Sequence, residues 1–116
     1  MKLGLETEQL GDGVYVVSPA GELDLYTCPE FKQELLGVIS SGARHVVVDL
    51  SLTTFVDSTA LGVLLRGVER LKAADGRLSV VCPDENILRV FQVTGLHRVF
   101  EIHGSRADAL RDVDTT

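Results

Sequence analysis

The chain has 116 residues, of which 45% are hydrophobic, and this size suits one domain with a single core. Its 17 acidic and 11 basic side chains give a net charge of −6, and the basic residues are scattered, which disfavours a nucleic-acid surface. Because no apolar run approaches the roughly 20 residues of a membrane span and the N-terminus has no targeting pattern, we expect one cytoplasmic domain, residues 1–116, without nucleic-acid or membrane partners.

The first third of the chain predicts a β-hairpin and then a helix. Two extended runs, residues 3–9 and 14–17, flank a Gly-Asp-Gly turn signal. Pro19 and Gly21 are expected to limit the second strand. A helix is predicted from Thr27, which forms a capping box with Glu30, and its apolar stripe and final glycine are Phe31, Leu35, Val38, Ile39 and Gly42.

The middle of the chain predicts a buried strand that leads into a long amphipathic helix. Residues 46–50 are a β-branched run typical of a strand buried on both faces. A polar connector, residues 51–54, follows. Apolar side chains then recur at helical spacing to about residue 74, at Leu61, Leu64, Leu65, Val68 and Leu71. Of these, Leu64 and Val68 are predicted to face the sheet.

The last third alternates again between strand and helix. Strands are predicted at residues 78–82 and 99–102, with a helix from residue 84 between them that ends at Gly95. A closing helix capped by Ser105 is expected to reach Val113, followed by a frayed end. This alternation predicts an α/β fold: a small, mostly parallel mixed sheet, an N-terminal hairpin at its edge and about four helices.

Ser58 is the candidate functional residue because it lies where the buried strand gives way to the helix. There it caps the helix or occupies its first turn, with Asp57 and Thr59 as alternative caps. Unpaired backbone N–H groups and the positive end of the helix dipole are expected to suit a phosphate on its hydroxyl. The alternative is that Ser58 or Asp57 only caps the helix.

Residue patterns for catalysis are missing around Ser58. A nucleophile elbow needs glycines two positions either side of the serine, and Val56 and Ala60 stand there. No histidine can be tied to Ser58 by spacing, and no phosphate-binding glycine motif follows a strand. Cys28 and Cys82 are isolated, so we expect them to be reduced and structural, without a metal site. These patterns argue against an enzyme.

Three segments resemble a known family. Gly21-Glu22-Leu23-Asp24, Val48-Asp49-Leu50-Ser51 and the stretch Phe55 to Gly62 are similar to the anti-sigma factor antagonists of bacteria, which are single STAS domains. The resemblance covers nearly the whole chain and implies a STAS fold. Ala60 stands where a glycine is often found.

The resemblance implies a phosphorylation switch. The unmodified protein would bind an anti-sigma factor that is also a serine kinase and so free a sigma factor. Phosphorylation of Ser58 by that kinase would end the binding, and a serine phosphatase would reverse it. ATP and metal belong to those partners, so the chain itself needs no cofactor. The implied partner-binding residues are Asp24, Asp57, Ser58, Thr59 and Gly62.

Two other classes of function remain open on the sequence. One is a STAS module that only binds, in a stress-signalling or transporter-associated complex, without phosphorylation; the other is a small enzyme that uses Ser58. Gly62 either lets a partner backbone approach closely or serves helix packing.

Overall fold

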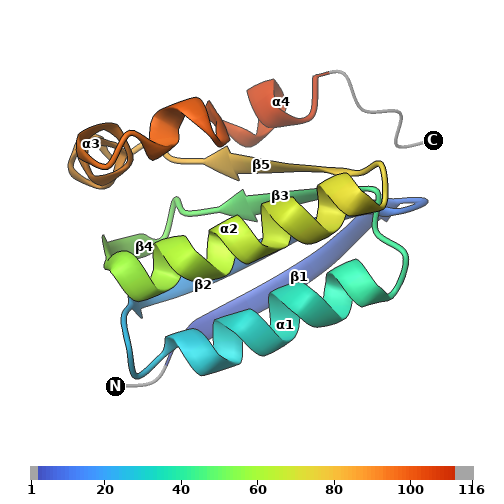
Figure 1. Ribbon diagram of the computed structural model, residues 1–116, viewed down its shortest axis with the longest axis horizontal. Helices are drawn as coiled ribbons and strands as arrows, with labels where there is room; N and C mark the ends of the chain where they lie inside the picture. Colours follow the sequence, from blue (N-terminus) through green and yellow to red (C-terminus); the bar gives the residue numbers. More distant parts are fainter. Residues whose placement is uncertain (1–2, 112–116) are drawn as a thin grey trace.

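The computed structural model describes residues 3–111, and in these residues six strands alternate with four helices (Figure 1). The elements are β1 (Gly4–Gly11), β2 (Val14–Leu23), α1 (Cys28–Ser40), β3 (His45–Asp49), β4 (Thr53–Val56), α2 (Ser58–Ala73), β5 (Arg77–Val81), α3 (Glu85–Val93), the 3-10 helix η1 (Leu96–Arg98), β6 (Glu101–His103) and α4 (Arg106–Ala109). The predicted α/β class is confirmed.

The sheet is mixed and mostly parallel. Its strand order is β1-β2-β3-β5-β6, and β4 pairs with β2 outside that row. Only the hairpin pair β1–β2, at the edge of the sheet, is antiparallel. Parallel neighbours require crossover connections, and α1, α2 and α3 supply them.

Alternate residues of the central strands pack on opposite faces of the sheet. Val46 and Val48 belong to the main core, together with the inward residues of α1 and α2. Val47 points the other way and packs in a smaller cluster with Ala109 of α4. Figure 1 shows α1 and α2 lying side by side over one face. This pair of parallel helices brings their N-terminal ends to the same edge of the domain.

The prediction for the second strand was wrong, because β2 continues through Pro19 and Gly21 to Leu23. Strand β2 changes partner along its length: it pairs with β3 over Val14–Val17 and with β4 from Gly21 onward. Pro19 lies between these pairings, where its missing N–H costs no ladder bond to either strand. The predicted connector at residues 51–54 therefore contains the start of a strand, β4, that the sequence reading missed.

Two further predictions need correction. Thr27 precedes α1, but its hydroxyl donates to the Glu22 carbonyl at 2.7 Å and forms no capping bond, so the capping box is wrong. The last strand begins at Glu101 because Gly95, with a φ of 75°, leads into η1 and Phe100 then packs edge-to-face on Phe91.

The closing helix is shorter than predicted. The Ser105 hydroxyl caps it, as expected, by accepting from the Asp108 N–H. However, α4 ends at Ala109. The predicted end at Val113 and the frayed residues after it lie outside the described residues. No helix in residues 3–111 has the length and apolar character needed to cross a membrane.

Candidate functional site

Ser58 is the first residue of α2, and its side chain is exposed. The cap is Asp57, whose Oδ1 accepts from the Thr59 N–H at 2.9 Å and the Ala60 N–H at 3.2 Å. Within residues 3–111 the Ser58 hydroxyl makes no hydrogen bond. The expectation of unpaired N–H groups beside it is therefore wrong for Thr59 and Ala60, since Asp57 already satisfies them. Ser58 is left as an exposed hydroxyl with no structural task.

Strand β4 brings Asp24 to the same edge of the domain as Asp57. Leu23 of β2 aligns with Val56 of β4, and the Asp57 N–H donates to the Leu23 carbonyl at 3.2 Å. Asp24 therefore directly follows the end of β2, and Asp57 directly follows the end of β4. The pairing of these two strands brings the two predicted site residues close together although they are far apart in the sequence.

Asp24 also shapes the loop that it begins. Its Oδ1 accepts from the N–H groups of Tyr26 at 2.9 Å and Thr27 at 3.0 Å. The bond from the Thr27 N–H is the main reason that the pKa of Asp24 is lowered. The turn leaves Leu25 64% exposed and Tyr26 87% exposed. Asp24 thus holds two apolar side chains out at the edge where Ser58 lies.

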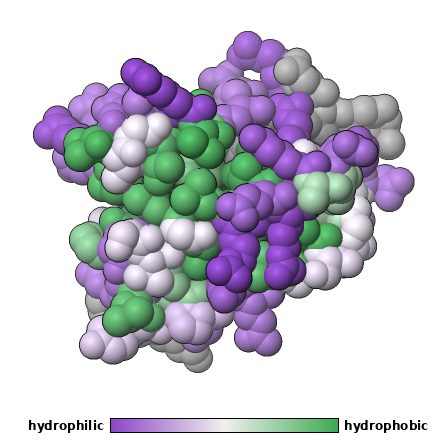
Figure 2. All heavy atoms as spheres, viewed as in Figure 1, coloured by the Kyte–Doolittle hydropathy of each residue, from purple (hydrophilic) through white to green (hydrophobic). Residues whose placement is uncertain are grey.

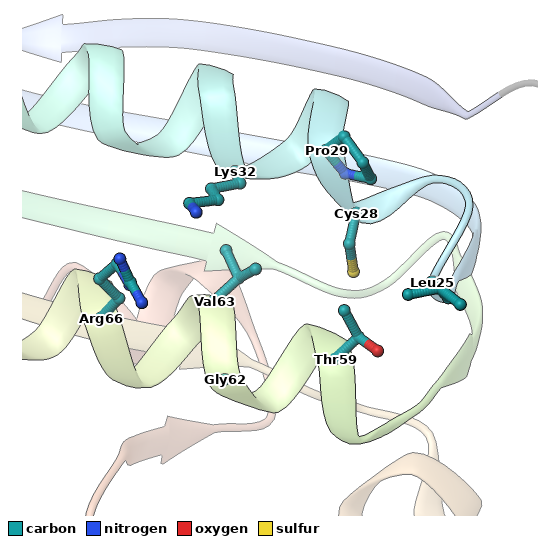
Figure 3. A pocket seen from close by; sticks show the side chains of 8 residues that line it. All are labelled: Leu25, Cys28, Pro29, Lys32, Thr59, Gly62, Val63 and Arg66. Carbon is teal, nitrogen blue, oxygen red and sulfur yellow. The ribbon is translucent and has the colours of Figure 1, made fainter.

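A groove of about 430 Å³ runs between the N-terminal halves of α1 and α2 (Figure 3). Thr59 and Gly62, both predicted site residues, line one side of it. The remaining lining residues are Leu25, Cys28, Pro29, Lys32, Val63 and Arg66. Burial raises the pKa of the Cys28 thiol to about 11, so this cysteine is a thiol at the floor of the groove. Both cysteines are free and buried, as predicted.

Gly62 has no packing reason to be glycine. A Cβ atom added there meets nothing within 4 Å, whereas one added at Gly67 lies 3.1 Å from a Leu78 methyl and 3.2 Å from a Leu35 methyl. Of the two readings of Gly62, the helix-packing one therefore fails. A mid-helix glycine costs roughly 0.5–1 kcal/mol relative to alanine, so its presence favours close approach from outside.

Gly62→Ala is expected to raise the free energy of unfolding by about 0.5–1 kcal/mol, because helix propensity improves without a clash. Gly67→Ala, the matched control in the same helix, is expected to destabilise because the neighbouring methyls must move. Urea denaturation measures both. A loss of stability in Gly62→Ala would show that the glycine serves the fold.

The exposed apolar surface around Ser58 was largely missed from the sequence. Leu52 is 67% exposed and Phe55 of β4 is 48% exposed. Figure 2 shows hydrophobic surface toward the end of the domain that carries β4 and the start of α2 in Figure 1, beside hydrophilic surface along the middle of α2. Arg66 could have been predicted as a neighbour of the site, because it lies four residues after Gly62 and so on the same face of the helix. Lys32 belongs to another helix, so its position in the sequence did not indicate that it lies near Gly62.

A hydrogen-bonded chain of the buried His45 and Ser79 and the exposed Glu101 lies across β3, β5 and β6, but it does not have the order of a hydrolytic triad. Ser79 Oγ donates to Glu101 Oε2 at 2.5 Å, so the His45 Nε2–H donates to Ser79 over 2.8 Å. The histidine therefore cannot take the proton of that serine. Ser79 is also fully buried, and His45 begins β3, at the opposite end of that strand from the segment that leads to Ser58.

Stability is expected to fall by up to about 3 kcal/mol between pH 6.5 and pH 4, owing to His45. Burial, followed by the charge of Arg77, lowers the pKa of His45 to about 4. Between pH 6.5 and pH 4, His45 binds a proton in the unfolded chain but stays neutral in the folded protein, so acidification favours unfolding. Chemical denaturation between pH 4 and pH 6.5 measures the free energy of unfolding as a function of pH. The variant His45→Gln should lose this pH dependence, whereas the control His97→Gln, which changes an exposed histidine, should retain it.

The fold and site together define a small α/β domain with an exposed serine at the start of α2 and a groove between α1 and α2. The chain belongs to the STAS domain family, which its residues 7–109 match. The sequence is 33% identical over 103 residues to an anti-sigma-B factor antagonist of Staphylococcus aureus, covering 89% of this chain and 94% of that protein.

Solved structures agree with this assignment. The crystal structure of an anti-sigma factor antagonist from Mycobacterium paratuberculosis has a TM-score of 0.87 and 32% identity, covering 96% of this chain and 93% of that one. A putative anti-sigma factor antagonist from Thermotoga maritima has a TM-score of 0.86 over 94% of this chain and 93% of its own. At 24% identity, the latter likeness concerns the fold alone.

Proposed function

We propose that this protein is an anti-sigma factor antagonist of the partner-switching type, acting in the cytoplasm. Its unmodified form binds an anti-sigma factor that is also a serine kinase and thereby releases a sigma factor. The observation that carries the proposal is the exposed Ser58 hydroxyl at the start of α2, which makes no hydrogen bond within residues 3–111. Asp24, Asp57, Thr59 and Gly62 surround it as the partner-binding surface.

The chain is a substrate and not an enzyme in this scheme. The kinase transfers the γ-phosphoryl group of ATP to Ser58 Oγ, takes up the hydroxyl proton and releases ADP. A serine phosphatase later hydrolyses the phosphoserine and returns inorganic phosphate. The nucleotide and any metal ion are held by these partners.

The placement of Ser58 supports a switch that works at the interface. Phosphate adds about −1.5 to −2 charges at neutral pH. Since Asp57 already occupies the N–H groups of Thr59 and Ala60, a phosphate on the exposed Ser58 projects into solvent beside the Asp57 carboxylate. The helix dipole offsets its charge within the fold. When a partner binds, however, the phosphate charge must be removed from water at the interface, and this cost weakens binding.

Ser58 is expected to be the single phosphoacceptor when the protein is incubated with ATP and its cognate kinase. Peptide mass spectrometry should place the phosphate there, and Ser58→Ala should abolish incorporation. Ser51 is a poorer acceptor because its hydroxyl already donates to Asp49 at 2.5 Å. Phosphate on Ser51, Thr54 or Thr59 would refute the assignment. Binding without any incorporation would support the plain interaction module.

A further inference from the structure

The groove between α1 and α2 carries positive charge that nothing in the described chain neutralises. Lys32 reaches into it from α1 and Arg66 from α2 (Figure 3). Neither side chain has a carboxylate within salt-bridge distance among residues 3–111. The lining contains no acidic residue, although the whole chain has 17 acidic and 11 basic side chains.

The charged pair lies above an apolar floor. Leu25, Pro29 and Val63 line the groove with the buried Cys28, so a segment seated there would contact both hydrocarbon and cations. An adjoining hollow along α2 carries two cations and one carboxylate, because it is lined by Gly62, Leu65, Arg66, Glu69 and Arg70. Both cations of the groove, Lys32 and Arg66, are exposed, so an anionic group of a partner can reach them and is attracted to both.

The groove is continuous with the Ser58 site. Ser58, Gly62 and Arg66 are spaced four residues apart and therefore follow one exposed face of α2. Gly62 leaves this face open where it meets the groove, since a Cβ there would meet nothing. A partner that contacts Ser58 can reach the groove without leaving the helix.

We propose that this groove is a second docking site, which takes an acidic and apolar segment of the anti-sigma factor kinase. The inference rests on the proposed function and adds how the partner is recognised. The carboxylates of the segment pair with Lys32 and Arg66, and its apolar side chains cover the floor. This contact holds the kinase on α2 so that Ser58 meets the active centre of the kinase, and it does not use Ser58 itself, which is not among the residues that line the groove.

The test compares the affinity of the full chain for the purified cognate kinase at about 50 mM and about 300 mM NaCl. The double variant Lys32→Glu, Arg66→Glu is expected to bind at least about tenfold more weakly at low salt and to lose most of the salt dependence. The control Arg89→Glu makes the same type of charge change at an exposed position on α3 and should stay within about twofold. Melting temperatures check that each variant folds.

The outcomes separate the two proposals. If the wild-type chain binds the kinase and is phosphorylated at Ser58, but the double variant binds equally well, the groove inference is wrong and the proposed function stands. If the kinase does not bind the wild-type chain, both are wrong. If sedimentation shows a dimer that the double variant dissociates, the groove holds a second copy of this chain and the kinase segment is excluded.

Discussion

Leu64→Ala is expected to lower the free energy of unfolding by about 2–5 kcal/mol. Leu64 is fully buried in the main core, on the side of α2 that faces the sheet. Val68, one turn further on, is also buried, which confirms the predicted inward face of the helix. The substitution removes three carbon atoms from a closely packed site and leaves a cavity that the fixed helix and sheet cannot close fully.

Urea denaturation of Leu64→Ala beside Leu65→Ala tests this expectation. Leu65 is the next residue of α2 but only partly buried against the core, so its truncation should cost clearly less. A loss below about 0.5 kcal/mol in Leu64→Ala would contradict the packing described for this helix.

Ser58→Asp is expected to weaken kinase binding at least about tenfold while leaving the melting temperature nearly unchanged. Ser58 is exposed at the positive end of α2, where a carboxylate is tolerated within the fold. At the interface the same charge stands beside Asp57 and must be desolvated by the partner. The unfavourable free energy therefore appears in binding and not in folding.

Ser58→Ala is the matched variant. It keeps the uncharged surface and cannot be phosphorylated, so it is expected to bind the kinase and stay bound in the presence of ATP. Aspartate carries one charge and reaches less far than phosphoserine, so calorimetry should also include the protein phosphorylated on Ser58. Unchanged affinity in both Ser58→Asp and the phosphorylated protein would refute the switch.

The sequence by itself determined the elements whose signals are local. The run at residues 46–50 predicted the buried strand β3, and the helical spacing that includes Leu64 and Val68 predicted the inward face of α2. Asp57 and Ser58 were recognised at the strand-to-helix junction, although which of them caps the helix was left open. Periodicity and capping chemistry involve residues within a few positions, so one stretch of chain is enough to read them.

Only the tertiary structure decided the features that depend on distant partners. Strand β4 exists because β2 leaves β3 and pairs with it, and this pairing brings Asp24 beside Asp57. Thr27 bonds the Glu22 carbonyl in place of its own helix. The groove needs Lys32 of α1 to face Arg66 of α2. Pairing and packing bring together residues up to tens of positions apart, and no local pattern specifies which of the possible partners they meet.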